Sequence, residues 1–172
     1  GLIASHHYLA YTTLEVFASS ITERTGLKGF LDMLSHASEF ASLPIRWGEE
    51  ATIRKLARHA PVALTAAAAA AAAGGDDDES LYAKPSVKAN ILLQSHFSRK
   101  RLPGGMFADL QAVLPQSISL LQSLVDVVAS SGWLKPALAC MELSQMVVQG
   151  VWINADAAEL LQIPHFTPEL AA

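Results

Sequence analysis

Residues 132–152 read G-W-L-K-P-A-L-A-C-M-E-L-S-Q-M-V-V-Q-G-V-W. Gly132 suits the left-handed position that ends a preceding helix, and Pro136 suits a first helical turn, where its missing N–H costs nothing. The large apolar residues recur every three or four positions, which predicts one unbroken helix through the middle of the domain. Its predicted inner face consists of Leu134, Leu138, Met141, Val148 and Trp152.

A narrow polar stripe follows the same predicted helix. At helical spacing Glu142, Gln145 and Gln149 fall within an arc of about 60°, beside Trp152. One interpretation is a seam that faces solvent or bonds to neighbouring helices. The other is a contact face for a partner or for a strand of RNA, because amides reach phosphate and bases and a tryptophan ring stacks on a base.

The rest of the chain also favours helices, since no segment alternates apolar and polar residues with the period of a strand. Pro115 is expected to kink or break a helix, and Thr12 with Glu15 has the spacing of a capping box. The fold class expected is all-α, a multi-helix bundle with one long central helix. The expected helices span residues 2–9, 12–25, 27–40, 49–60, 87–99, 106–114, 116–131, 133–152 and 155–163, and another begins at Thr167.

Residues 62–83 have a different character from the rest of the chain. An unbroken alanine tract, 66–73, precedes a glycine pair and an acidic run, 76–79. Alanine favours helix but offers no large side chain to pack, and the acidic run is typical of a solvated loop. The expected layout is a helical-bundle domain over residues 1–163, with 62–83 as a low-complexity insertion, and the start of a further helical domain over 164–172.

Composition limits the function classes. The 172 residues carry a net charge of −4, and 16% are charged, against about 25% in an average domain. A free-standing protein that binds nucleic acid through phosphate contacts alone is therefore not expected. No run of 18 to 20 large apolar residues predicts a membrane span, and the single cysteine, Cys140, fits packing in a reducing compartment.

Self-contained catalysis is not expected. The sequence has no glycine-rich phosphate loop, no G-x-S-x-G, no His-Glu-x-x-His and no Cys-x-x-Cys. The six histidines are scattered, and no two of them lie one helical turn apart. We therefore expect no catalytic residue, no metal site and no cofactor in this chain.

A basic run offers a second contact candidate. Arg99, Lys100 and Arg101 lie at the end of the predicted helix 87–99, with Lys84 just before that helix and Lys88 in its first turn. Basic residues at a helix C-terminus complement the helix dipole, which explains the run without a ligand. The alternative is contact with an RNA phosphate.

Several ordered blocks carry a family resemblance. They are I-A-S-H-H-Y-L-A-Y-T-T-L-E-V-F (3–17), L-P-I-R (43–46), V-K-A-N-I-L-L-Q-S-H-F-S-R (87–99), the stretch 132–152 and I-P-H-F-T (163–167). Together they resemble the helical bundle of a Sec63-type unit. More narrowly, they are similar to the C-terminal cassette of the spliceosomal DExH-box RNA helicases of the U5 small nuclear ribonucleoprotein.

The resemblance implies a function for the parent protein and a place for this bundle in it. In that family the bundle follows two RecA-like domains, which use ATP and Mg²⁺, and a winged helix. By position, residues 133–152 correspond to the ratchet helix that crosses the path of the unwound strand. The implied partners are other domains of the same helicase, spliceosomal proteins and single-stranded RNA, in the nucleus and away from any membrane.

Charge at the ratchet position favours a docking role. A ratchet helix that works on nucleic acid tends to carry basic or aromatic side chains, whereas this one offers only Lys135 and the acidic Glu142. The expected function is a scaffold and protein-docking domain, with RNA guidance as an open alternative. Two other proteins are candidates for the full-length parent. One is a related helicase of the activating signal cointegrator complex type, and the other is the membrane translocation protein that gives the unit its name.

Overall fold

The computed structural model describes residues 11–65, 79–155, 158–167 and 170. In these ranges every regular element is a helix, so the all-α prediction is confirmed. The elements are α2 (Tyr11–Ser20), α3 (Leu27–Ser35), the 3₁₀ helix η1 (Ser38–Phe40), α4 (Glu49–Arg58), α6 (Glu79–Tyr82), α7 (Pro85–Phe97), α8 (Gly104–Ser130), α9 (Leu134–Gln149) and α10 (Ala158–Leu161).

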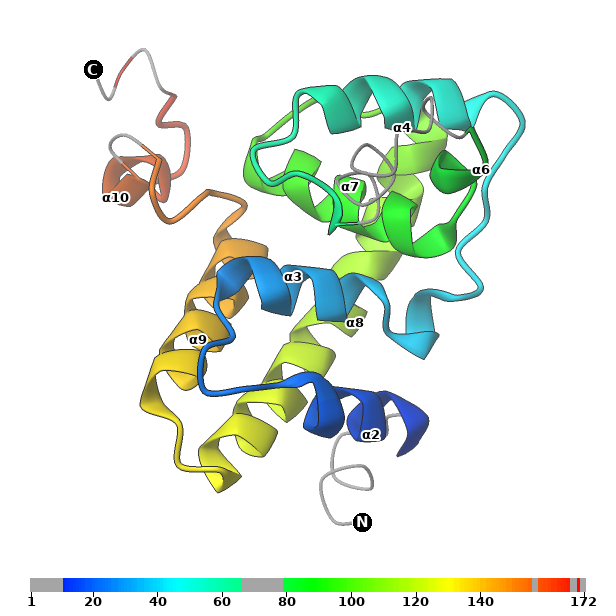
Figure 1. Cartoon of the computed structure of the whole chain (residues 1–172). Helices are drawn as coiled ribbons and strands as arrows, with labels where there is room; N and C mark the ends of the chain where they lie inside the picture. Colours follow the sequence, from blue (N-terminus) through cyan, green and yellow to red (C-terminus); the bar gives the residue numbers. More distant parts are fainter. Residues whose placement is uncertain (1–10, 66–78, 156–157, 168–169, 171–172) are drawn as a thin grey trace.

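The long helix α8 spans the whole bundle. Helices α4, α6 and α7 gather at its N-terminal end, and α2, α3 and α9 surround its C-terminal end (Figure 1). Helices α8 and α9 pack against each other most extensively, as an antiparallel pair joined by the turn at Gly132, which has φ +72° as the sequence predicts. The bundle therefore has its long central helix, but that helix is α8 rather than the predicted segment 133–152.

The predicted break at Pro115 is wrong. Helix α8 runs unbroken through this residue for 27 residues. Proline removes the hydrogen bond to the carbonyl four residues earlier, at Gln111. Both Pro115 and Gln111 are exposed, so water can satisfy that carbonyl, while Leu110, Leu120 and Leu124 hold the helix in the core on its other side.

Helix α7 is buried on nearly all sides. Ten of its 13 residues are buried, and α3, α4, α6, α8 and α9 all pack on it. Its polar residues are satisfied inside the core: the Gln94 amide donates to the Val62 carbonyl at 2.8 Å and accepts from the Val62 N–H at 2.9 Å.

Several predicted boundaries differ from the observed ones. The expected helix 27–40 is divided, because α3 ends at Ser35 and η1 follows after Ala37. Thr12 lies inside α2, which already includes Tyr11, so it does not begin that helix. The next residue, Thr13, is buried and donates to the Glu39 carboxylate at 2.8 Å. The expected helices 49–60 and 155–163 are shorter, as α4 and α10, and the expected helix 2–9 lies outside the described residues.

The ends of segment 62–83 belong to the core. Leu64, Leu81 and Tyr82 are buried, and Val62 is held by Gln94. The alanine tract and most of the acidic run fall outside the described residues. Removing the whole segment would therefore remove three core side chains, at roughly 2–5 kcal/mol for each large one.

Candidate functional site: the outward face of helix α9

Helix α9 presents to solvent the face that the sequence predicts as its inner one. The residues that are buried are Pro136, Cys140, Leu143, Met146 and Val147, which pack towards α8 and α3. The predicted inner residues are the exposed ones: Leu134 is 73% exposed, Leu138 51%, Met141 50% and Val148 67%. Because α9 is apolar on almost every side, spacing alone cannot tell which of its two apolar arcs packs inward.

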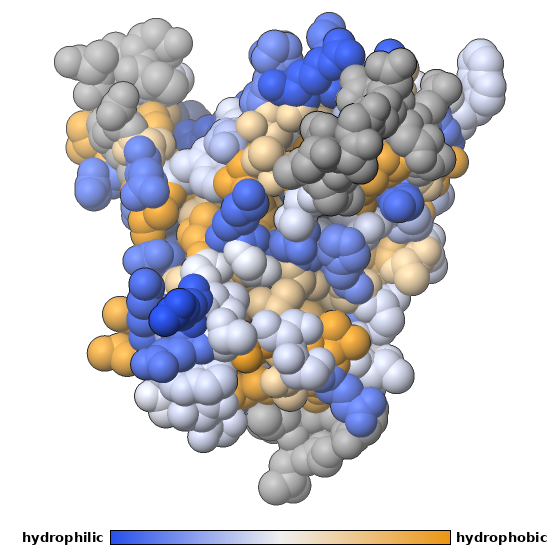
Figure 2. Space-filling model, in the orientation of Figure 1, coloured by the Kyte–Doolittle hydropathy of each residue, from blue (hydrophilic) through white to orange (hydrophobic). Residues whose placement is uncertain are grey.

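The outward face combines apolar groups with the predicted polar stripe. At 100° per residue, seven exposed side chains fall within an arc of about 120° opposite the core. We call this set the α9 face: Leu134, Leu138, Met141, Glu142, Gln145, Val148 and Gln149. Figure 2 shows hydrophobic side chains protruding over α9 at the edge of the molecule. Glu142, Gln145 and Gln149 are thus exposed as expected, but between large apolar neighbours, and Lys135 is exposed in the first turn.

Trp152 does not belong to this face. Helix α9 ends at Gln149, because Gly150 adopts φ +62° and its N–H bonds back to the Met146 carbonyl at 2.9 Å. The chain then turns, and the indole N–H of Trp152 donates to the Ser98 hydroxyl at 2.9 Å. The Trp152 ring meets the Phe97 ring edge-on, with the centroids 5.2 Å apart. The prediction of an unbroken helix to Trp152 is therefore wrong, and the half-buried Trp152 ring packs on α7 instead of lying on the α9 face.

The three residues of the basic run have separate positions. Arg99 holds the chain after α9, since its guanidinium donates to the carbonyls of Gly150 and Leu161. The Lys100 ammonium donates to the His59 carbonyl at the end of α4, at 2.9 Å. Arg101 is exposed. Arg99 and Lys100 therefore both have structural roles, and of the three only the Arg101 side chain has no such role within the described residues.

A buried ion cluster, which sequence reasoning missed, joins the loop 43–48 to α4, α7 and α8. Lys88 is fully buried, and its ammonium donates to the Pro44 carbonyl and to the carboxylates of Glu49 and Asp109. The Arg46 guanidinium forms a two-pronged pair with Asp109 at 2.6 and 2.9 Å and also bonds Glu49 at 2.8 Å. Lys88 therefore cannot contact RNA; the only signal in the sequence is its place in a predicted helix between Val87 and the apolar residues 91–93.

These contacts shift the pKa values of the charged groups in the cluster. Hydrogen bonds from Arg46, and then from Lys88, lower the pKa of Asp109 to about 2, against the opposing effect of burial. Burial raises the pKa of Glu49, but hydrogen bonds from Lys88 and Arg46 outweigh it, so the net shift is downward. Hydrogen bonds to Asp109 and Glu49 raise the pKa of Arg46 above its ordinary range.

The cluster predicts acid sensitivity. A carboxylate whose pKa is lower in the folded state stabilises the fold above its ordinary pKa, 3.8 for Asp109, and that stabilisation is lost as pH falls towards about 2. The free energy of unfolding should therefore decline between about pH 4 and pH 2, and Asp109→Asn should decline less steeply. Urea unfolding at several pH values measures how the free energy of unfolding changes with pH in the unaltered chain and in Asp109→Asn. The same dependence on pH in both proteins would contradict the role of Asp109.

Comparison with known proteins gives the family. A family model described as the Sec63 Brl domain matches residues 1–171. The chain belongs to the Sec63 Brl domain family. The match covers the bundle, the α9 face and the ion cluster together, and it confirms the resemblance drawn from the sequence blocks.

Relatives of this Sec63 Brl domain are RNA helicases and related proteins. The chain is 44% identical over 171 residues to the DExH-box ATP-dependent RNA helicase DExH12 of Arabidopsis thaliana, covering 99% of the chain. It is 39% identical over 169 residues to the U5 small nuclear ribonucleoprotein 200 kDa helicase of Homo sapiens (98%), and 41% identical over 165 residues to the activating signal cointegrator 1 complex subunit 3-like protein of Dictyostelium discoideum (96%). The chain spans about 7% of the length of each relative.

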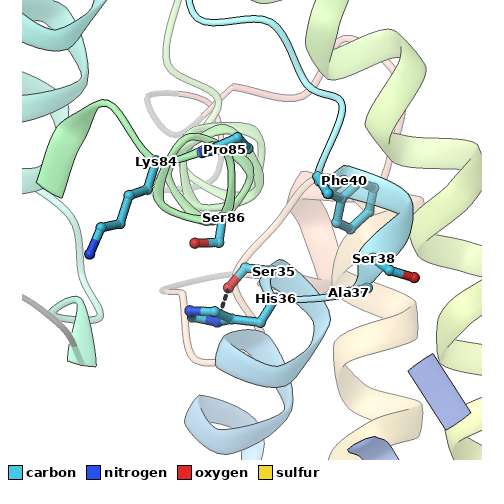
Figure 3. A pocket seen from close by; sticks show the side chains of 9 residues that line it. Ser35, His36, Ala37, Ser38, Phe40, Lys84, Pro85 and Ser86 are labelled. Atoms are coloured by element: carbon cyan, nitrogen blue, oxygen red, sulfur yellow. Dashed lines mark hydrogen bonds between the residues drawn. The ribbon is translucent and has the colours of Figure 1, made fainter. Parts of the chain in front are cut away.

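The Sec63 Brl domain also holds an open cavity of about 380 Å³ between the end of α3 and the start of α7. Figure 3 shows Ser86 of α7 pointing towards Ser35 and His36 across it, with Lys84 at one side. The Ser35 hydroxyl lies 3.4 Å from His36 Nδ1 but donates to the Asp32 carbonyl at 2.7 Å. This serine is therefore not oriented as a nucleophile with histidine as its base.

Two other predictions concern metals and membranes. Within the described ranges no three His, Cys, Asp or Glu side chains lie close enough to hold a metal ion. Helix α8 is long and apolar enough by length and composition to cross a bilayer, although the sequence shows no continuous apolar run. This helix packs against α2, α3, α7 and α9, and core helices can pass the same test of length and composition.

Cys140 packs in the core of the domain. Its thiol lies 3.7 Å from the Leu121 carbonyl of α8, and burial raises its pKa to about 12. At neutral pH the thiolate is scarce, so the group acts as a small apolar side chain.

Proposed function

We propose that this chain is the non-catalytic helical-bundle domain of a spliceosomal DExH-box RNA helicase and that the α9 face is its protein-docking surface. The relatives that match nearly the whole chain include ATP-dependent RNA helicases and the U5 small nuclear ribonucleoprotein helicase. Under this proposal ATP and Mg²⁺ act in other domains of the parent, residues 164–172 begin the next domain, and the protein works in the nucleus.

The observation that carries the docking role is the composition of the α9 face. Four large apolar side chains are exposed on one helix, spaced one or more turns apart along its length. Exposed apolar groups that form a contiguous stripe mark surfaces that another protein covers, and a helix commonly offers such a stripe to a groove. The flanking amides can supply the polar rim that protein interfaces have.

The charge of the face argues against RNA as its main partner. Lys135 and Glu142 are the charged residues of α9 itself, and their charges cancel. Binding to a phosphate backbone depends on several cations that replace counterions. The α9 face lacks such a cluster, whereas apolar anchors are what protein partners use.

Strand guidance is the second candidate, because the amides of Gln145 and Gln149 are exposed. Gln149 is partly engaged, since its amide donates to the Gln162 side chain at 3.1 Å. The 41% identity to the activating signal cointegrator 1 complex subunit 3-like protein supports a helicase of that type as the alternative parent.

Crosslinking distinguishes the two roles. A photo-crosslinking amino acid at Met141, in the full-length parent within its assembled ribonucleoprotein, should crosslink mainly to protein. The same group at Gln122, an exposed residue of α8, is the matched control and should give less crosslinking. Crosslinks from Met141 mainly to RNA would favour strand guidance and contradict the docking role.

A further inference from the structure

A basic surface forms where the end of α4 meets the turn after α7. It contains Arg54, Lys55, Arg58, His59, Lys100 and Arg101, which we call the basic patch. Five of the twelve Lys and Arg residues of the chain lie in it, although the chain as a whole has a net charge of −4. From this concentration we propose that the basic patch binds the phosphate backbone of RNA.

The fold brings the two halves of the patch together. Ile53 is fully buried and Leu56 and Ala57 pack on the core, so helical spacing directs Arg54, Lys55 and Arg58 outwards. The Lys100 ammonium donates to the His59 carbonyl at 2.9 Å, which fixes the 99–101 turn beside the last turn of α4.

The positive charge is held at one end of α4. Lys55, Arg58, His59 and Arg101 are exposed, and Arg54 and Lys100 are half-buried. The carboxylates of α4, Glu49 and Glu50, lie in its first turn, and Glu49 is committed to the buried Lys88 and to Arg46. Figure 2 shows hydrophilic side chains gathered over α4, on a different part of the molecule from the α9 face.

The composition of the patch favours RNA over an acidic protein. Protein interfaces draw most of their affinity from large apolar or aromatic anchors at a desolvated centre, and none of the six side chains provides one. Attraction to phosphates requires only cations and their counterion release. Arginine adds a planar, two-pronged fit to phosphate.

This site does not depend on the docking role proposed for the α9 face. The two sets of residues share no member and lie on different helices. One can therefore fail while the other holds, and the test below contains a variant of each.

The test measures RNA binding by the full 172-residue chain. Fluorescence anisotropy of a labelled oligouridylate of about 16 nucleotides reports the binding. Lys55→Gln with Arg101→Gln should weaken binding roughly tenfold at about 50 mM salt and reduce the slope of log affinity against log salt by about 1.4, at about 0.7 per contact on a single strand. Arg24→Gln with Lys28→Gln removes the same charge from two exposed positions, one before α3 and one in its first turn, and should change both values little.

Four outcomes would overturn the proposal. They are no binding by the unaltered chain at low salt, an equal loss in the Arg24/Lys28 control, an equal loss in Leu138→Asp, and competition by polyglutamate as strong as by unlabelled RNA. An equal loss in the control would mean that net charge alone decides. Loss in Leu138→Asp would locate the RNA on the α9 face, and polyglutamate competition would indicate an acidic protein partner. Circular dichroism of each variant checks that it is folded.

Discussion

Replacing Lys88 by methionine should lower the free energy of unfolding by about 3–5 kcal/mol. The side chain is fully buried, and its ammonium neutralises the carboxylates of Glu49 and Asp109 inside the bundle. Its removal leaves two carboxylates with the single guanidinium of Arg46 and leaves the Pro44 carbonyl without its donor. A buried ion whose partner is removed costs far more than an exposed pair does.

Urea unfolding followed by circular dichroism measures this loss. Lys84→Met is the matched control, because Lys84 is an exposed lysine at the start of the same helix. It should change the free energy of unfolding by no more than about 0.5 kcal/mol. Equal effects of the two substitutions would mean that Lys88 is not the buried centre of an ion cluster.

Leu143→Asp should leave little folded protein. Leu143 is fully buried on the inward side of α9, against α8 and α3. The change removes a core side chain, at about 2–5 kcal/mol, and buries an unpaired carboxylate in its place. Domains have a total stability of only about 5–15 kcal/mol, so the combined cost takes most or all of it.

Leu138→Asp, on the opposite side of the same helix, is the matched control. Leu138 is 51% exposed, so an aspartate there stays in water and costs less than about 1 kcal/mol through its weaker helix propensity. Thermal unfolding curves separate the two variants. If Leu138→Asp unfolded the chain while Leu143→Asp did not, α9 would pack with the face that the sequence spacing predicts.

Sequence spacing predicts that α9 is a helix but not which side of it is buried. Both arcs of α9 carry large apolar residues, and the choice between them depends on α8 and α3, which the local pattern does not include. Gly150 illustrates a second limit. A Cβ atom there would lie 3.0 Å from the His96 ring, so the turn that redirects Trp152 is fixed by a contact with α7, 54 residues earlier in the chain.

The ion cluster shows that a charged residue in the sequence does not reveal whether its side chain will be buried or exposed. Lys88, Arg46, Glu49 and Asp109 come from separate segments, and each one alone fits an exposed helix or loop position. Only the crossing of α7 with α4 and α8 brings them together. The features that spacing does predict are local ones: the glycine turn before α9, the exposure of Glu142, Gln145 and Gln149, and the helical class of the chain.

The central claim is that the α9 face docks a protein partner of the parent helicase. Its most direct test is Leu138→Asp in the full-length parent, with incorporation into the ribonucleoprotein measured by quantitative co-purification. Incorporation should fall while the thermal unfolding of this domain changes little. Incorporation equal to that of the unaltered parent would contradict it.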